Sequence, residues 1–232
     1  MRRIGVAILL VVLAACGSAS SKPGATSTTT ASTRPVTAAD RIAQAGLLRR
    51  ADFPNDYRAG PPTKSDDGAI RSTPACAAFP LLTDHGIATA YSPSFFSRDA
   101  LIANKVDVFS DAQPPRAFIE ELRNPAIISC LHDLVAASLA GSTATAVTSI
   151  DVSPLAVDLV GDDASGFRFT FASTTSGTAT MTVQDQVVAR VGRTILILRP
   201  VAKTSGDLAQ LETRLLPLLV KRLQDAGASR TP

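Results

Sequence analysis

The stretch from Ala144 to Leu198 constrains the fold most, because its apolar and polar residues alternate and only short turns interrupt it. Phe167, Phe169 and Phe171 are separated by polar residues, which is typical of a strand with one buried face. Connections as short as these turns join antiparallel neighbours. The sequence therefore predicts an antiparallel meander, with strands over 144–152, around 167–171, over 178–191 and over 195–198, and with turns at 174–177 and 192–193.

The first half of the chain predicts a mixture of helices and strands. Thr37 has the position of an N-cap, with Asp40 in the first turn of a helix that runs to about Arg50. Residues 55–74 are rich in Pro, Gly and Asp, which predicts a long loop. The other predicted elements are strands over 87–92 and 105–110 and helices over 114–124 and 126–139.

Leucines at helical spacing predict a final helix from about Gly206 to Ala226, kinked at Pro217. Antiparallel strands followed and preceded by helices indicate a single α+β domain. We expect an antiparallel sheet of about five strands, with helices covering one face of it.

The N-terminus predicts export. Arg2 and Arg3 precede an uncharged run that is too short to span a bilayer, which makes residues 1–15 a signal peptide. Leu13-Ala14-Ala15-Cys16 resembles the bacterial lipobox. That resemblance implies that Cys16 takes a diacylglycerol, becomes the new N-terminus and, with further acyl chains such as palmitate, anchors the protein in the cell membrane on its extracytoplasmic side. The alternative is an ordinary signal peptide with an incidental cysteine.

Residues 16–36 are predicted to be the lipidated cysteine and a tether. Ten of the 20 residues over 17–36 are Ser or Thr, and prolines interrupt any regular pattern. Such a segment cannot bury enough apolar surface to offset its ordering entropy. A Ser/Thr-rich stalk is also a candidate for O-linked sugar. The extracytoplasmic domain is predicted over 37–232.

Cys76 and Cys130 remain as an even pair after Cys16 is assigned to the anchor. Outside the cytoplasm such a pair is predicted to form a disulfide. Closing a loop of this length contributes roughly 3–4 kcal/mol on the chain-entropy model. Two buried thiols or a redox couple are the alternatives, although neither cysteine lies in a Cys-X-X-Cys motif.

Several motifs together resemble a known family. They are Leu47-Leu48 followed by Asp52-Phe53-Pro54, Val106-Asp107-Val108-Phe109 before a helix near Cys130, Gly192-Arg193-Thr194-Ile195 after the meander, and the Leu-rich final helix. This pattern resembles the exported sensor-like lipoproteins of actinobacteria related to the extracellular domain of the kinase PknH. The resemblance implies a mixed sheet-and-helix domain with a cleft for an unidentified ligand. Ile127 stands where the family has Trp, and a second Cys pair is missing.

Candidate catalytic residues are few. His85 and His132 are the only histidines, and no Gly-X-Ser-X-Gly motif accompanies them. His85 with Gly86 is typical of a turn, and His132 lies beside Asp133 on an amphipathic helix. Two histidines without free cysteines do not predict a zinc site, and no phosphate-binding motif is present. We therefore predict no catalytic residue, no metal and no cofactor.

Other candidate residues have structural explanations. Asp66-Asp67 and Asp162-Asp163 are acidic pairs in Gly-containing turns, without the spacing of a calcium loop. Phe167, Phe169 and Phe171 fit core packing better than a ligand pocket. Phe95-Phe96, in a predicted loop, would line a pocket or fill the core.

The charge balance argues against nucleic-acid binding. Without Arg2 and Arg3 the chain has 21 basic and 20 acidic residues, and only 5% of it is aromatic. The leading hypothesis is a non-enzymatic, membrane-anchored cell-envelope lipoprotein whose sensor-like domain binds a small-molecule, lipid or protein ligand. The alternatives are an envelope hydrolase or lipid-handling enzyme that uses His85 or His132, and a structural wall-associated protein.

Overall fold

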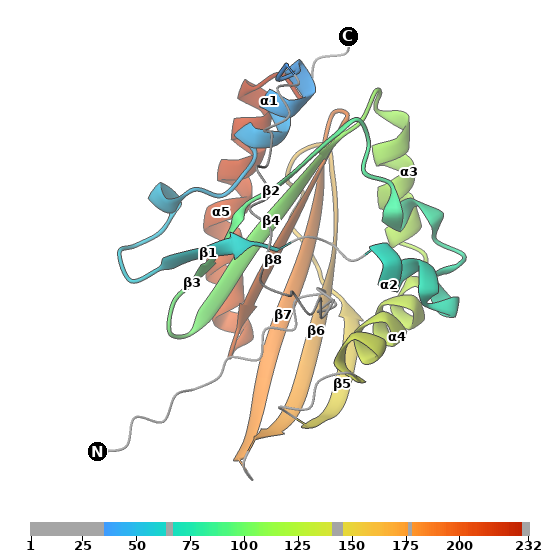
Figure 1. Cartoon of the computed structure of the whole chain (residues 1–232), viewed down its shortest axis with the longest axis vertical. Coiled ribbons are helices and arrows are strands. Elements are labelled where there is room, and N and C mark those ends of the chain that lie inside the picture. Colours follow the sequence, from blue (N-terminus) through green and yellow to red (C-terminus); the bar gives the residue numbers. More distant parts are fainter. Residues whose placement is uncertain (1–34, 64–66, 141–145, 176–177, 229–232) are drawn as a thin grey trace, which may run out of the picture.

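One antiparallel sheet of eight strands organises the computed structural model, which describes residues 35–63, 67–140, 146–175 and 178–228 (Figure 1). The strand order is β1-β3-β4-β8-β7-β6-β5, and β2 also pairs with β4. The predicted α+β class is confirmed, with eight strands where about five were predicted. The strands are β1 (Arg58–Pro62), β2 (Ala88–Tyr91), β3 (Pro93–Phe96), β4 (Ala100–Val108), β5 (Ala146–Pro154), β6 (Asp163–Thr175), β7 (Thr178–Val191) and β8 (Thr194–Ala202).

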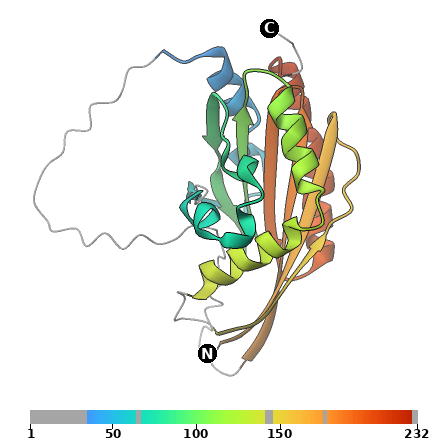
Figure 2. The same ribbon diagram turned by 90° about the vertical axis from the view of Figure 1, so that its right-hand side faces the viewer.

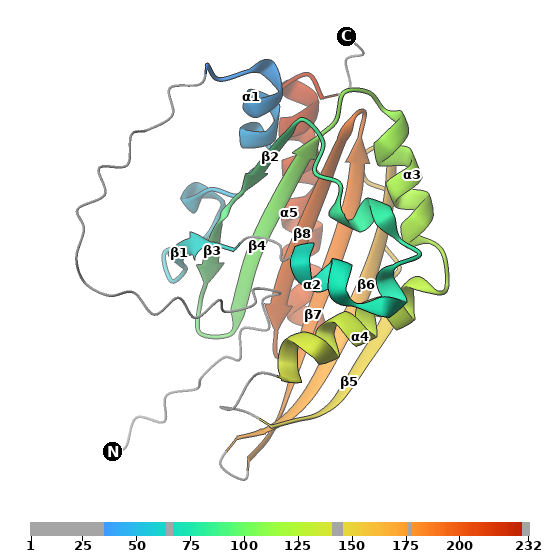
Figure 3. The same ribbon diagram turned by 45° about the vertical axis from the view of Figure 1, so that its right-hand side comes forward.

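Helices cover both faces of the sheet, so the prediction that they cover one face is wrong (Figures 2 and 3). Helices α1 (Ala38–Ala45) and α5 (Ser205–Asp225) lie on one face. Helices α2 (Asp67–Ser72), α3 (Gln113–Leu122) and α4 (Ile127–Ala140) lie on the other, with short 3-10 turns at Pro74–Cys76 and Pro80–Thr83. A third 3-10 turn, at Arg50–Asp52, lies on the α5 face, where Asp52 pairs with Arg222 of α5. The central strands alternate apolar residues toward both layers, and this alternation requires helices on each side.

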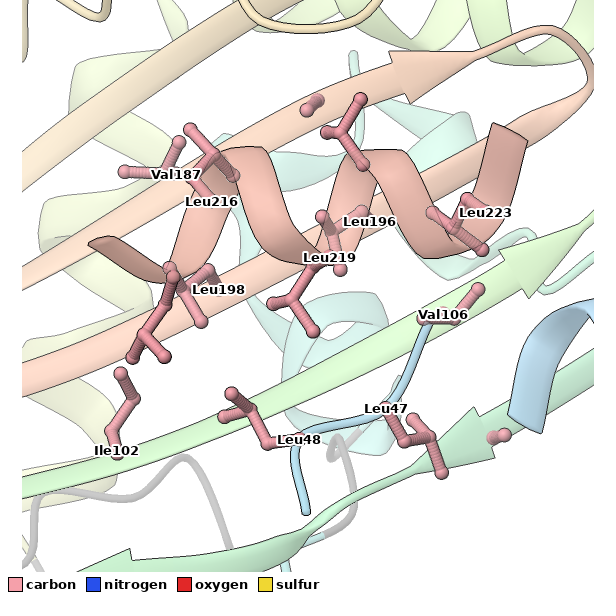
Figure 4. Packing of buried hydrophobic residues seen from close by; sticks show 14 of the residues in the cluster. Leu47, Leu48, Ile102, Val106, Val187, Leu196, Leu198, Leu216, Leu219 and Leu223 are labelled. Atoms are coloured by element: carbon pink, nitrogen blue, oxygen red, sulfur yellow. The ribbon is translucent and has the colours of Figure 1, made fainter. Parts of the chain in front are cut away.

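Two hydrophobic clusters lie on opposite faces of the sheet. The α5 core contains Leu216, Leu219 and Leu223 of α5, which pack against Leu196 and Leu198 of β8 (Figure 4). The α4 core contains residues from the other side of β8 and buried apolar residues of α3 and α4. Its largest residues on the sheet are Phe167, Phe169, Phe171, Ile195 and Ile197. The phenylalanines at 167, 169 and 171 are thus core residues, as predicted.

The first helix begins as predicted and ends early. The Thr37 hydroxyl and the Asp40 carboxylate form a capping box. The helix stops at Gly46 because buried Asn104 of β4 binds the backbone that follows: its Nδ2 donates to the Gly46 carbonyl at 2.8 Å, and its Oδ1 accepts from the Leu48 amide at 2.9 Å. This tertiary contact replaces the helical hydrogen bonds that would have carried the helix to Arg50.

Three further elements differ from the prediction. The loop predicted over 55–74 contains β1 and α2, and the loop around Phe95-Phe96 is strand β3. Helix α5 continues without interruption past Pro217, whose side chain is exposed. No helix among the described residues is both long and apolar enough to cross a membrane.

Candidate functional site

The two cysteines predicted to pair lie together inside the α4 core. The Sγ atoms of Cys76 and Cys130 are 2.11 Å apart, and both residues are almost completely buried. The pair connects the 3-10 turn at Pro74–Cys76 to helix α4. Cys16, the signal peptide and most of the tether lie outside the described residues.

A group of buried and partly buried charged and polar side chains lies on the α4 side of the sheet; we call it the sheet-face cluster. It consists of His85 and Thr89 at the start of β2, Lys105 and Asp107 of β4, and Arg199 and Gln186 of β8 and β7. In β4 these charges alternate with Val106 and Val108, which face the α5 core. The register of the sheet therefore places the charges on the opposite face.

Asp107 is the centre of the hydrogen bonds in this cluster. Its Oδ2 lies 2.9 Å from the Lys105 Nζ, and its Oδ1 accepts a hydrogen bond of 2.7 Å from the Thr89 hydroxyl. The Lys105 Nζ also lies 2.7 Å from Nδ1 of His85, which accepts because an ammonium group only donates. His85 Nδ1 is 3.8 Å from the Asp107 carboxylate, so Lys105 is the closer partner of that carboxylate.

Burial dominates the electrostatics of the cluster. Lys105 is 5% exposed and Asp107 is 3% exposed. Burial raises the pKa of Asp107 above its usual range, while the Lys105 ammonium and the Thr89 hydroxyl act in the opposite direction. Buried charges with shifted pKa values are typical of functional sites, although structural ion pairs also produce them.

Arg199 extends the cluster toward β7. Its Nε donates to Oε1 of Gln186 at 3.1 Å, and burial lowers the pKa of its guanidinium. Among the residues that the structure describes, no carboxylate forms an ion pair with it. Among the described residues, the carboxylate in contact with Lys105 is that of Asp107, and Arg199 lies farther along the same face of the sheet.

The structure places the two histidines and the Phe95-Phe96 pair, which the sequence singled out as candidates, in different parts of the domain. His85 belongs to the sheet-face cluster, whereas His132 is exposed on α4 with its Nδ1 3.2 Å from Asp133. Phe95 fills the α5 core and stacks on Phe53, and Phe96 points to the opposite face with 38% of its surface exposed.

The acidic pairs are accounted for by backbone and ion-pair contacts. Asp162 accepts from the Gly192 amide and from Arg190, and Asp163 pairs with Arg123. Asp66 lies outside the described residues, and Asp67 begins α2. Across the described ranges, no group of three or more His, Cys, Asp or Glu side chains is placed to hold a metal ion.

Sequence reasoning missed Lys105, Asp107 and Arg199 as site residues. A usable signal was present, because Lys105 and Asp107 occupy alternate positions of a strand whose other residues, apart from Asn104, are apolar. A central strand with charges on one face predicts that this face meets something other than a hydrophobic layer. The contribution of Arg199 depends on which strand lies beside β4, and the sequence does not state that.

A groove between the sheet and the helical layer lies at another place on the same side. It has a volume of about 360 Å³ and separates the α3–α4 corner from the β5–β6 segment. Its apolar lining includes Ile127, Ile128, Leu155, Val157 and Phe167. It contains none of the charged residues of the sheet-face cluster.

A second charged cluster lies on the α5 side. Arg168 of β6 donates twice to the fully buried Asp185 of β7, from Nε at 2.8 Å and from Nη2 at 2.7 Å. Glu212 of α5 lies against the same carboxylate. Burial, together with the hydrogen bond and the negative charge of Asp185, raises the pKa of Glu212 to about 8. Glu212 is therefore protonated at neutral pH and joins α5 to the sheet.

Glu212→Gln is expected to remove a loss of stability at alkaline pH. In the folded chain the pKa of Glu212 is about 8 instead of its usual 4.5, so the folded state binds more protons between these values. The contribution of Glu212 to the free energy of unfolding is therefore fully present below the pKa that Glu212 has in the unfolded chain, and it is lost as the pH rises through the pKa that Glu212 has in the folded chain. A glutamine keeps a donor for Asp185 and does not ionise. We compare the free energy of unfolding of the variant with that of the wild type. Because Glu212 is partly exposed, we expect this difference to be only about 1–2 kcal/mol more in favour of the variant at pH 9 than at pH 5.

Urea unfolding at pH 5, 7 and 9 measures this difference. Glu120→Gln, on the exposed side of α3, is the matched control and should follow the wild-type pH profile. An identical pH profile for Glu212→Gln and the wild type would show that Glu212 is not protonated in the folded chain at neutral pH.

Comparison with known proteins finds similarity to solved structures alone. No protein-family model matches the sequence, and no curated protein matches it. The extracellular domain of PknH from Mycobacterium tuberculosis is 13% identical, with coverage of 81% of this chain and 98% of that chain and a TM-score of 0.47. LpqN, involved in cell envelope biogenesis of the same organism, is 13% identical, with coverage of 75% and 78% and a TM-score of 0.28. PA94 from Pseudomonas aeruginosa, of unknown function, is 12% identical, with coverage of 65% and 85% and a TM-score of 0.22.

Proposed function

We propose that this chain is an exported lipoprotein, anchored through Cys16, whose α+β domain binds a ligand on the sheet-face cluster without transforming it. The observation that carries the ligand-binding part is the burial of Lys105 and Asp107 on the sheet face opposite the α5 core, with the partly buried Arg199 on the same face. Desolvating the charges of Lys105 and Asp107 costs free energy, and an apolar face of the same shape would stabilise the fold as well or better. Their retention supports a role in recognition.

The arrangement around His85 favours binding over catalysis. A hydrolase of the Ser–His–Asp type needs the histidine to accept a proton from a nucleophile and to be oriented by the carboxylate. Here the Asp107 carboxylate contacts Lys105 and Thr89 more closely than His85, and the Thr89 hydroxyl donates to Asp107 and to the His85 carbonyl. The Lys105 ammonium lies 2.7 Å from Nδ1 of His85, which is the ring nitrogen that the carboxylate of such a triad would orient.

An envelope hydrolase using His85 is the second candidate, supported by the 3.8 Å distance between His85 Nδ1 and Asp107. Assays with p-nitrophenyl esters of short and long acids distinguish it from the binding proposal. We expect no hydrolysis above that of the His85→Ala variant. A wild-type rate that His85→Ala abolishes would replace the binding proposal with the enzyme.

Cys16→Ser is expected to abolish the lipid anchor. In a bacterium with lipoprotein processing, the wild-type chain should incorporate radiolabelled palmitate and partition with the membrane, because the thiol carries the diacylglycerol. The variant should carry no label. Cys76→Ser is the control and should still be labelled. Label retained by Cys16→Ser would move the acylation site elsewhere.

Native mass spectrometry tests the ligand. Both hydrophobic clusters lie between Ala39 and Ala228, so a chain of residues 17–232 with a cleavable export leader contains the whole core. We expect a native ion with extra mass that denaturation removes. The double variant Lys105→Met/Asp107→Leu should lose this mass and remain folded, because apolar residues of similar volume replace the buried pair.

The exposed ion pair of Lys203 and Asp99, 2.7 Å apart, provides the matched control. Lys203→Met/Asp99→Leu removes the same charges from the surface and should retain the extra mass. A wild-type ion without extra mass, or extra mass that Lys105→Met/Asp107→Leu retains, would exclude the sheet-face cluster as the ligand site.

A further inference from the structure

We propose that a groove on the α5 face of the sheet binds a small zwitterion, whose carboxylate pairs with Arg214 and whose ammonium group pairs with Asp56 and Asp207. The ligand carries two opposite charges separated by several bonds, as a short peptide or an ω-amino acid does. Leu211 belongs both to the wall of this groove and to the α5 core, so the groove lies on the face opposite the sheet-face cluster. The inference therefore goes beyond the proposed function and does not depend on it.

The groove, which we call the α5 groove, has a volume of about 340 Å³. One wall is helix α5, from which Asp207, Gln210, Leu211 and Arg214 line it. Their spacing of three, four and seven positions places them on one stripe of the helix. The loop before β1 and the turn between β3 and β4 form the other walls. Ligand sites begin at about 300 Å³, so this volume fits a small molecule.

Arg214 is the cation of the α5 groove. Its guanidinium forms no ion pair and no hydrogen bond with another residue that the structure describes. The neighbouring Gln210 side chain, one turn earlier on α5, is likewise without such a partner. A planar guanidinium fork matches the two oxygens of a carboxylate. Arg214 is thus available to hold the anionic end of a ligand.

Two carboxylates of the α5 groove are available to a cation. Asp56 forms no ion pair and no side-chain hydrogen bond within the described ranges. Asp207 uses Oδ2 to accept a hydrogen bond of 2.7 Å from the Thr204 hydroxyl, and its Oδ1 remains for another donor. Asp99, at the edge of the groove, is already paired with Lys203 and receives no role here.

The presence of both signs of charge in one groove selects a zwitterion. A ligand with a negative charge alone would be attracted by Arg214 and repelled by Asp56 and Asp207, and a ligand with a positive charge alone would meet the reverse. Asp207 and Arg214 are seven positions apart on α5, which separates their Cα atoms by about 10 Å along the axis. Side chains two helical turns apart favour a ligand whose charges are separated by a chain, and not an α-amino acid.

Apolar surface for that chain is provided by Tyr57. Its ring lines the α5 groove, is partly exposed, and stacks on Phe53 of the α5 core with 4.9 Å between the ring centroids. This stacking holds the ring in place before any ligand arrives. A hydrocarbon or peptide spacer can therefore contact a pre-formed aromatic surface while its two ends reach the charged side chains.

NMR titration of the ¹⁵N-labelled chain of residues 17–232 at pH 7 tests the proposal with 6-aminohexanoate, hexylamine and hexanoate. These probes share a six-carbon chain and differ in their charged ends. We expect 6-aminohexanoate to bind at least five-fold more tightly than either singly charged probe and to shift the amide signals of α5 around residues 207–214. Glycine should bind more weakly than 6-aminohexanoate. Tighter binding of the dipeptide Ala-Ala than of 6-aminohexanoate would identify a peptide as the natural ligand, and the reverse order an ω-amino acid.

Arg214→Gln should weaken binding of 6-aminohexanoate at least five-fold without weakening that of hexylamine. Asp56→Asn should also weaken binding of 6-aminohexanoate, without weakening that of hexanoate. Arg116→Gln on α3 and Asp151→Asn on β5 are charge-matched controls at exposed positions away from the groove and should bind as the wild type does. Because all four positions are exposed, each variant should melt near the wild-type temperature.

Hexylamine, hexanoate or glycine binding as tightly as 6-aminohexanoate would overturn the ligand class. Binding that neither Arg214→Gln nor Asp56→Asn weakens, or amide shifts confined to another surface, would overturn the site. If no probe binds, both are wrong. The proposed function is tested separately, because the removable native mass and its loss in Lys105→Met/Asp107→Leu report on the opposite face of the sheet.

Discussion

The double variant Cys76→Ala/Cys130→Ala is expected to lose roughly 3–4 kcal/mol of unfolding free energy, because the disulfide closes a long loop in the unfolded chain. The two cysteines are separated by 54 positions, and their bond attaches the Pro74–Cys76 turn to α4. Alanine fits both sites with little strain, so the loss reflects the missing cross-link more than a cavity. Urea unfolding followed by circular dichroism measures it.

Treatment of the wild type with reductant should reproduce most of this loss, and the same reductant should not affect the double variant. Intact mass in denaturant provides the second check, since the oxidised chain is two protons lighter than the reduced one. A double variant that unfolds at the wild-type urea concentration would show that the bond is absent from the folded protein or that its loop is already ordered in the unfolded chain.

Arg168→Met is expected to destabilise the domain by about 3 kcal/mol, because it removes the bidentate partner of a fully buried carboxylate. Asp185 is 0% exposed and accepts both of its short hydrogen bonds from Arg168. The carboxyl group of Glu212, on α5, lies beside the Asp185 carboxylate. Removing the arginine leaves two acidic groups without a cation on the sheet side of α5. Urea unfolding at pH 7 gives the difference in free energy.

The double variant Arg168→Met/Asp185→Leu should recover most of the loss, since it replaces the whole ion pair with apolar side chains. Lys221→Met serves as the control, because its pair with Asp225 is exposed on α5 and its removal changes stability by no more than about 0.5 kcal/mol. Equal stabilities for Arg168→Met and Lys221→Met would show that water reaches Asp185 in the folded chain.

Local patterns predicted the parts of the fold that depend on alternation. The meander from β5 to β8 and the leucine face of α5 follow from apolar spacing alone, and each lies within a few residues of its predicted position. β1 and β3 were missed because prolines end the first and begin the second; proline is tolerated in an edge strand such as β1 and at the first residue of a strand, as in β3. The early end of α1 depends on Asn104, which is 58 positions from Gly46.

The candidate site was less predictable for the same reason. His85 was identified as a histidine worth testing, but its neighbours Lys105 and Asp107 are 20 and 22 positions away, and Arg199 joins them only because β8 pairs with β4. The sequence shows charges at alternate positions of one strand. It does not show which strands are adjacent, and the order of the strands determines which side chains lie beside Arg199.

The covalent loop between Cys76 and Cys130 contains β2, β3, β4 and α3, and with them His85, Thr89, Lys105 and Asp107. A protease that cuts the chain once between 77 and 129 therefore releases no fragment, because the two pieces remain joined through sulfur. On a gel without reductant such a nicked protein migrates as one band. Four of the side chains that form the sheet-face cluster thus stay attached to the domain after a cut that would otherwise divide it.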